Sequence, residues 1–283
     1  MKKILLVFTL LFALISVVAC GETTTEATTS ATTEVTTEEP LRVGMDLRYP
    51  PFETIDLDSN PEGISVDVAL AFGEFLGREV EIVNTDFAAI IPALNSGEID
   101  IAIASMSITE EREQSVDFTD PYFYFKIISL LNKDFADSNS LNEDSTIEDL
   151  LALEDVNYVG LASQVSVSIP ESYGKSVIES TDLSTAIESV AQGTADVLLM
   201  SANPVVNGYK ANPSTTIVLW DAFVASPIGM AVAEGNSELL AQANAFIDTF
   251  NEVGGLYEAL AEDWDSVLLE SLGRYGLEFY INE

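Results

Sequence analysis

The sequence predicts an α/β protein built from two similar halves. Short β-branched runs, such as residues 80–83 and 99–103, alternate with helical stretches, such as 66–77 and 239–250, and this alternation is typical of α/β folds. In addition, residues 97–105 and 193–201 share one skeleton, in which Gly is followed by Asp three positions later, an aliphatic run and a final Ser. Such a turn is common enough to recur by coincidence, but matching strands upstream of both copies favour two related lobes.

The first 20 residues predict an export signal. Lys2 and Lys3 precede an apolar run over 4–19, which is shorter than the roughly 20 residues of a membrane-spanning helix. The small residues before Cys20 resemble the lipobox of bacterial lipoproteins, and the alternative is an uncleaved membrane anchor. We expect cleavage before Cys20, lipidation of that residue, and a protein held by its lipid on the outer face of the cell membrane.

Residues 21–40 predict a disordered tether, because nine Thr and five Glu with few apolar side chains cannot offset the entropy of ordering the chain. The remaining 243 residues, 41–283, are enough for two lobes with a substantial core.

The composition excludes several chemistries. With no His and one Cys, the chain lacks an imidazole acid or base and a thiolate zinc site. Its 11 basic against 47 acidic residues, a formal charge of −36, argue against a nucleic-acid partner. The acid-rich segment 56–63 resembles a calcium loop, but Pro61 stands where the sharp turn needs Gly. We expect a polar hairpin loop there, and neither a metal nor a cofactor.

Polar side chains follow the predicted strands in both halves. Ligands of open α/β sheets bind beyond the carboxyl ends of the strands. Asp46 and Ser105 lie at that edge in the first half, and Ala162 and Ser201 in the second. Two such edges facing each other would form a cleft.

An anion site is predicted just after Ser105. Ser105, Ser107 and Thr109 supply hydroxyls, Thr109 suits a helix N-cap, and Arg112 would occupy the third position of that helix. Tyr49 follows the first predicted strand, and Phe87 precedes the turn into a helix marked by Pro92. Aromatic rings at a strand-end loop can clamp the apolar part of a ligand or pack in the core.

Several segments together resemble the polar amino acid substrate-binding proteins of ABC importers, solute-binding family 3. They are residues 42–52, 63–67, 86–100, 105–112 and 116–122. The resemblance implies the type II periplasmic-binding-protein fold, with two α/β lobes joined by two crossover strands near Phe125 and Ile228. Lobe 1 would comprise 41–125 and 228–283, and lobe 2 would comprise 126–227.

The resemblance also implies roles for individual residues. Arg112 and Ser107 would bind the ligand carboxylate, with Ser166 of the second lobe capping it on closure. Ser105 would help bind the α-amino group. Tyr49 and Phe87 match the aromatic residues between which the family holds its ligand. Asp46 matches an acid that often reaches the ligand side chain. At Ser201 the family commonly has the Asp that pairs with the ligand ammonium. Either another carboxylate, with Asp46 the nearest candidate, replaces it, or the ligand is not a standard α-amino acid.

The sequence therefore predicts a monomeric, lipid-anchored receptor that captures an amino acid or similar small zwitterion outside the cell, delivers it to an ABC permease and performs no bond chemistry. One alternative is a lyase or dehydratase-like enzyme on the same scaffold, with Asp46 or Glu53 as acid or base. Another is an extracellular sensory binding module presented by the tether.

Overall fold

The computed structural model describes residues 39–273 and 275–281. The predicted export signal, Cys20 and all but the last two residues of the predicted tether lie outside the described residues. Within the described part, no helix is both long enough and apolar enough to cross a lipid bilayer.

The first sheet has five strands in the order β4-β1-β5-β12-β6. Their bounds are Leu41–Met45 (β1), Val80–Asn84 (β4), Ile101–Ala102 (β5), Val116–Phe118 (β6) and Ala231–Ala233 (β12). β1 runs parallel to β4 and β5, whereas β12 is antiparallel to both of its neighbours. Most of the side chains on β1, β5 and β12 are buried, which explains their runs of aliphatic residues.

Two helices belong to the first half of the chain: α1 (Ile64–Leu76) and α2 (Ile90–Ser96). α1 buries Ile64, Val68 and Phe72, which recur every four residues and therefore share one face. It ends at Gly77, which adopts the left-handed conformation that favours glycine at the C-terminus of a helix.

The second sheet has the order β11-β7-β10-β8-β9. Its strands span Phe123–Asn132 (β7), Tyr158–Leu161 (β8), Val177–Ser180 (β9), Val197–Ser201 (β10) and Thr216–Ile228 (β11). Its helices are Lys133–Ser138 (α3), Ile147–Leu151 (α4), Val165–Ser172 (α5), Leu183–Ala191 (α6) and Ala202–Ala211 (α7). β8 runs parallel to β9 and β10, and β7 is antiparallel to β10 and β11.

The predicted internal repeat is structural. β1 pairs in parallel with β5 in one sheet, as β8 does with β10 in the other, and each sheet continues with an antiparallel strand. The repeated Asp has the same task in both halves. Asp100 accepts a hydrogen bond from the Arg42 amide and donates its own amide to the Arg42 carbonyl, both at 2.8 Å, and Asp196 does the same with Asn157.

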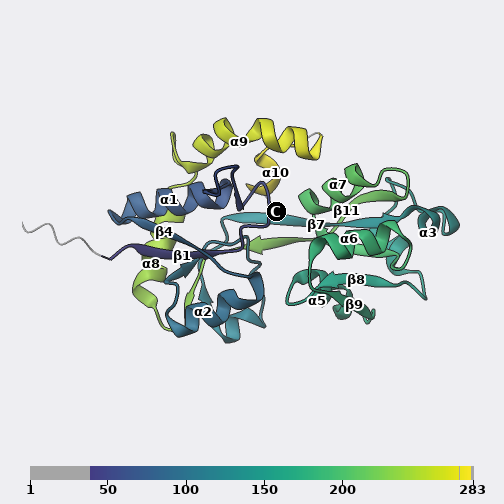
Figure 1. The fold of residues 1–283 in the computed structure, drawn as a ribbon, viewed down its shortest axis with the longest axis horizontal. Helices are drawn as coiled ribbons and strands as arrows, with labels where there is room; N and C mark the ends of the chain where they lie inside the picture. The colour runs from purple at the N-terminus through teal and green to yellow at the C-terminus, as the bar shows by residue number, and fades with distance from the viewer. Residues whose placement is uncertain (1–38, 274, 282–283) are drawn as a thin grey trace, which may run out of the picture. The chain divides into compact units, whose positions relative to one another are not determined.

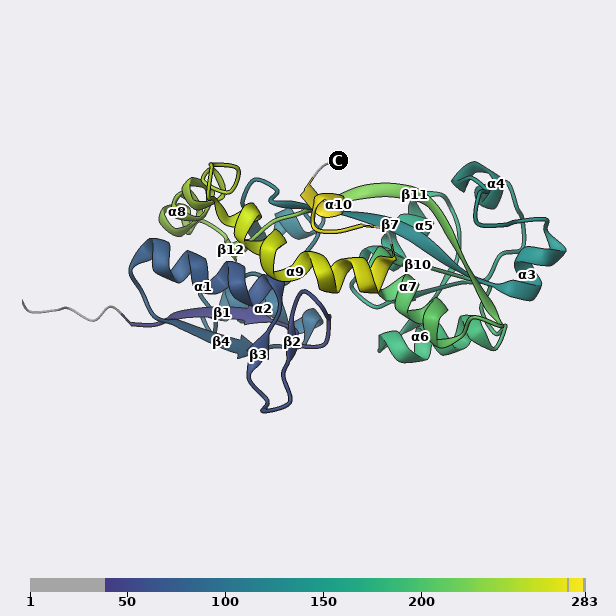
Figure 2. The same cartoon turned by 90° about the horizontal axis from the view of Figure 1, so that it is seen from above.

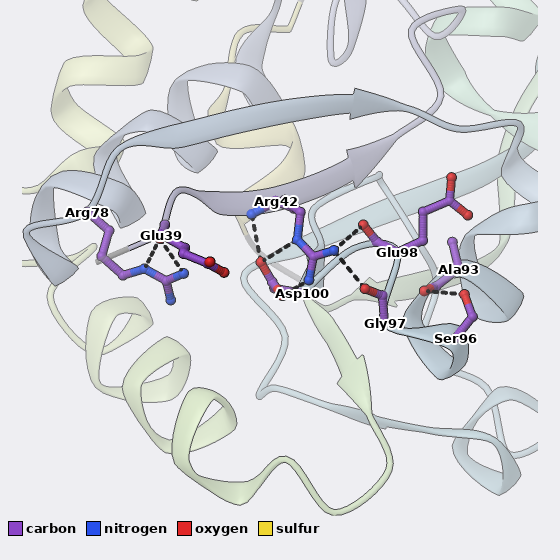
Figure 3. A network of polar contacts seen from close by, with 8 residues as sticks. All are labelled: Glu39, Arg42, Arg78, Ala93, Ser96, Gly97, Glu98 and Asp100. Atoms are coloured by element: carbon purple, nitrogen blue, oxygen red, sulfur yellow. Dashed lines mark hydrogen bonds and ion pairs between the residues drawn. The ribbon is translucent and has the colours of Figure 1, made fainter. Parts of the chain in front are cut away.

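Arg42 strengthens this link in the first half. Its guanidinium pairs with Asp100, with Nη2 2.5 Å from Oδ1, and Nη1 donates to the carbonyl oxygens of Gly97 and Glu98 at 2.7 and 2.9 Å (Figure 3). The end of α2 is thereby fixed against β1, which sets the register in which β5 delivers Ser105 to the same sheet edge as Asp46.

Two long antiparallel strands, β7 and β11, run between the two halves (Figure 1). Their paired residues extend from Phe123 opposite Ile228 to Asn132 opposite Thr216, and Ile228 also forms a bridge with Ser107 of the first half. The predicted crossover positions, Phe125 and Ile228, lie on these strands. The predicted α/β architecture, two sheets with flanking helices and two connecting strands, is confirmed.

The C-terminal part of the chain contacts both halves. It contains α8 (Ser237–Ile247), α9 (Leu256–Leu272) and α10 (Glu278–Ile281), and α9 packs against both α1 and α7 (Figure 2). Tyr280 is fully buried, with its ring against Phe52 and Phe125 and its hydroxyl donating to the amide oxygen of Asn203. This one side chain therefore joins a loop of the first half to α7 of the second.

The acid-rich segment is a hairpin. β2 (Thr54–Ile55) pairs with β3 (Pro61–Glu62) in antiparallel orientation. Asp56 closes the turn, since its carboxylate accepts from the amides of Asp58 and Asn60, each at 2.8 Å. The predicted polar hairpin loop is confirmed.

Candidate functional site

A cavity of about 530 Å³ lies between the facing strand ends of the two lobes. Seven of the eight residues predicted to bind a ligand line it: Asp46, Tyr49, Phe87, Ser105, Ser107, Arg112 and Ser201. The first six come from the first half of the chain and Ser201 from the second, so the site exists only where the two lobes meet.

Arg112 contacts both lobes. Its Nη1 donates to the carbonyl oxygen of Ser107 at 2.8 Å, and its Nη2 donates to the carbonyl oxygen of Ser163 at 2.7 Å. The prediction of a helix here was wrong, because only a 3₁₀ turn forms, over Arg112–Gln114. Thr109 still accepts from the Arg112 amide, at 3.3 Å, as a cap would, but a single turn has no useful helix dipole. Of the two features predicted to attract an anion, the structure therefore contains the guanidinium but not the N-terminus of an α-helix.

The charge of Arg112 is poorly compensated. Burial lowers the pKa of its guanidinium to about 10, against a weaker opposing effect of Glu111. The group is still cationic at neutral pH, and no carboxylate in the described part of the chain forms an ion pair with it. Its partners are two neutral carbonyl oxygens and the Phe87 ring, whose centroid lies 5.2 Å from the guanidinium carbon. A partly desolvated cation with neutral partners favours an anionic ligand group.

Tyr49 reaches across the cavity. It is held in a tight turn by the exchange of backbone hydrogen bonds with Glu53, at 2.8 and 3.1 Å, and its phenol hydroxyl is hydrogen-bonded to the hydroxyl of Ser201 in the other lobe. Burial raises the pKa of the Tyr49 phenol, so the hydroxyl keeps its proton. The pair is a direct link between the lobes.

Glu53 is a buried acid at the edge of this cavity. Only 1% of its surface is exposed, and Ser105 Oγ donates to its Oε2 at 2.9 Å. Ser105 has a left-handed backbone (φ 49°), which is uncommon for residues other than glycine and is often found at functional sites. Burial raises the pKa of Glu53 to about 8, opposed by the hydroxyls of Ser65 and Ser105. No cationic side chain in the described residues forms an ion pair with this carboxyl group.

Asp46 is already engaged. Its Oδ1 accepts from Arg48 Nε at 2.7 Å, and its Oδ2 accepts from Arg48 Nη2 at 2.8 Å and from the Phe87 amide at 3.0 Å. From the sequence, Asp46 is the nearest candidate to replace the missing ammonium partner, and in the structure each of its oxygens already accepts a hydrogen bond from Arg48. Glu53, considered from sequence only as an acid or base of an enzyme, is the acid next to Ser105.

Ser166 does not line the cavity. It is fully buried at the start of α5, where its hydroxyl accepts a hydrogen bond from the Leu161 amide at 2.8 Å. α5 packs so tightly on β8 that a Cβ at Gly160 would lie 2.5 Å from the carbonyl oxygen of Ser166. The hydroxyl therefore fastens the helix to the strand, and its neighbours Gln164 and Val165 face the cavity instead.

Comparisons with known proteins agree with this geometry. The model of "Bacterial extracellular solute-binding proteins, family 3" matches residues 41–266. A probable histidine-binding protein of Neisseria gonorrhoeae is 27% identical over 217 residues, which are 75% of this chain and 78% of that protein.

Two solved structures are also similar. One is an ancestral arginine-binding protein bound to arginine, with 31% identity and a TM-score of 0.66 over 80% of this chain and 98% of that one. The other is the ancestral amino acid-binding protein AncCDT-1, a precursor of cyclohexadienyl dehydratase, with 31% identity and a TM-score of 0.67 over 80% and 94% of the two chains. The fold is thus the type II periplasmic-binding-protein fold, and the chain belongs to the bacterial extracellular solute-binding proteins of family 3.

Proposed function

We propose that this protein is a receptor for an α-amino acid, which binds between the two lobes. The main support is one observation: among the described residues, a partly buried guanidinium without a carboxylate partner and a buried carboxyl group without a cationic partner line the same cavity. An α-amino acid supplies the two complementary charges on neighbouring atoms. The names of relatives that bind histidine and arginine agree with this class of ligand.

In this proposal Arg112 binds the ligand carboxylate. Its two bonds to Ser107 and Ser163 hold the guanidinium at the junction of the lobes, and Ser107 lies beside it. From the second lobe, Gln164 and Val165 at the start of α5 face the cavity. In this proposal they cap the ligand carboxylate, the role that the sequence predicted for Ser166.

Glu53 and Ser105 bind the ammonium group. The hydroxyl of Ser105 already orients the carboxyl group at 2.9 Å, and a bound ammonium would stabilise its ionised form. Ser201 supplies a hydroxyl through its contact with Tyr49, not a charge. The aromatic rings of Tyr49 and Phe87 line the space for the apolar part of the ligand.

Binding would hold the lobes together. Residues 41–125 with 228–283 form lobe 1 in this proposal, and 126–227 form lobe 2, joined by β7 and β11. A ligand that touches Arg112 from one side and the start of α5 from the other gains contacts only when the lobes are close, so it shifts the population toward the closed form.

A panel of the 20 amino acids, and of matched amines and carboxylic acids lacking the second charge, tests the proposal by thermal shift and calorimetry. A ligand specific for the native state raises the melting temperature by mass action. We expect at least one amino acid to bind and its singly charged analogues to bind far more weakly. If no amino acid stabilises the protein, the proposed function is wrong.

We further propose that the receptor is monomeric, anchored by lipid on Cys20 outside the cell, and delivers its ligand to an ABC permease. The family supports the extracellular location and the solute-binding role, and the sequence of residues 1–20 supports the lipid anchor. A Cys20→Ala variant expressed in a bacterial host should leave the membrane fraction, whereas the parent protein should stay in it.

One observation supports a second candidate, a lyase-like enzyme. A buried carboxyl group whose pKa is raised to about 8 is suited to general acid catalysis at neutral pH. Prolonged incubation with each bound ligand, followed by NMR, separates the two functions. A binding protein returns the ligand unchanged, whereas an enzyme yields product that disappears in Glu53→Gln.

A further inference from the structure

The Arg48 side chain lies in the ligand cavity but takes no part in the proposed binding of the α-carboxylate and ammonium groups. It binds Asp46 through two donors, Nε and Nη2, at 2.7 and 2.8 Å. This is the bidentate geometry in which a guanidinium binds a carboxylate best. Asp46 is well shielded, with 15% of its side chain exposed, whereas 67% of the Arg48 side chain is exposed.

The same guanidinium also faces two other acids. Its Nη2 lies 2.7 Å from Asp86 Oδ1. Asp182, from the other lobe, lines the cavity too; its pKa is lowered mainly by hydrogen bonds from Thr185 and, to a smaller extent, by Arg48. Arg48 is thus the cation among three carboxylates at one end of the cavity.

This end is distinct from the end at Arg112. Phe87 lies between them, because its amide binds Asp46 while its ring faces the Arg112 guanidinium. A ligand whose carboxylate is bound by Arg112 would therefore direct its side chain toward Asp46 and Arg48.

The three acids differ in what they offer a ligand. Asp86 is 79% exposed, so a pair with it is strongly screened by solvent. Both oxygens of Asp182 accept from Thr185, at 2.8 and 2.7 Å. Asp46 is the shielded acid, and Arg48 occupies both of its oxygens.

We propose that Arg48 is a specificity residue that fills the cation subsite on Asp46, so that the receptor selects amino acids with uncharged side chains. This inference rests on the proposed function. A cationic side chain must displace a guanidinium that is tethered two residues away and hence present at high local concentration. An anionic side chain meets an excess of carboxylates. An uncharged side chain avoids both costs.

The test compares affinities for glutamine, arginine, lysine and glutamate by calorimetry in the full chain and in Arg48→Ala. We expect the parent protein to prefer uncharged amino acids. In Arg48→Ala, arginine and lysine should bind about tenfold more tightly or better relative to uncharged amino acids, because Asp46 is then available to them.

Two control variants identify the cause. Arg78→Ala removes the same charge from the turn that follows α1, where the guanidinium binds the Glu39 carbonyl, and should not change arginine affinity. Asp46→Asn combined with Arg48→Ala should abolish the gain. Unchanged arginine affinity in Arg48→Ala, or a gain that survives in the double variant, would overturn the inference while leaving the proposed function intact. Failure of every amino acid to bind any variant would overturn both.

Discussion

Arg112 of the first lobe donates to the carbonyl oxygen of Ser163 in the second lobe at 2.7 Å. Ser163 has a left-handed backbone (φ 64°) in the loop between β8 and α5, so the contact reaches the start of the helix that faces the cavity. One side chain that lines the cavity therefore also connects the two lobes.

Replacement of Arg112 by Ala should weaken amino acid binding by about 2–5 kcal/mol, because it removes one partner of a desolvated ion pair. Arg112→Lys should recover only part of this loss, since an ammonium cannot donate to Ser107, Ser163 and a carboxylate in the fork geometry of a guanidinium. Calorimetry measures both affinities. Unchanged affinity in Arg112→Ala would remove Arg112 from the site.

Tyr49 offers a second, smaller test. Tyr49→Phe keeps the ring but removes the hydroxyl bonded to Ser201, so we expect binding to weaken by about 0.5–1.5 kcal/mol, the net contribution of one hydrogen bond. Small-angle scattering of the ligand-free variant should also show a larger radius of gyration, because a contact between the lobes is lost. A Tyr209→Phe variant, altered on the surface of α7, should match the parent protein in both measurements.

Much of the fold could be predicted because the determining signals are local or repeated. The Gly-x-x-Asp turn occurs before both β5 and β10, and in each half the Asp makes the same pair of backbone bonds, to Arg42 or to Asn157. Strand ends could then be located, and with them Asp46, Ser105 and Ser201. The prediction of a helix after Thr109 failed, because only three residues there adopt a helical conformation and so short a segment does not form an α-helix.

The partners within the site could not be predicted. Sequence places Asp46, Arg48 and Glu53 within eight residues, but it does not say which carboxylate the guanidinium binds or which is buried. The loop bends so that Arg48 meets Asp46 while Glu53 turns inward to Ser105. Likewise, Ser166 is kept out of the cavity by the close approach of α5 to β8 at Gly160. This approach depends on how the helix packs on the strand, which the local sequence does not reveal.

Tyr280 should be important for stability although it lies beyond the part of the chain that matches the family model. Tyr280→Ala removes a fully buried ring between Phe52 and Phe125, and we expect a loss of about 3–5 kcal/mol in the free energy of unfolding. Tyr280→Phe should cost about 1–3 kcal/mol, because the amide oxygen of Asn203 loses its donor. Urea denaturation measures the free energy of unfolding of both variants. Equal stability of the parent protein and the two variants would contradict the proposed packing role of Tyr280.

Glu53 should make the stability of the ligand-free protein depend on pH. Its folded-state pKa of about 8 exceeds its ordinary value of 4.5. At a pH between these two values, the folded chain therefore keeps a proton that the unfolded chain has released. The stabilisation is complete below pH 4.5 and is lost as the pH rises to about 8. Urea titrations from pH 5 to 9 should show this decline in the parent protein and a weaker one in Glu53→Gln, and parallel profiles would contradict it.

Ligand binding should release a proton from the same group. Below about pH 8 most Glu53 side chains of the free protein are protonated, whereas a bound ammonium favours the carboxylate. Affinity should therefore rise by up to about tenfold per pH unit toward pH 8 and then level off, because only the ionised form pairs with the ammonium. Calorimetry in two buffers of different ionisation enthalpy counts the protons released at pH 7. Glu53→Gln, which has no proton to lose, should bind weakly and without this pH dependence; if it retains the slope, another group is titrating.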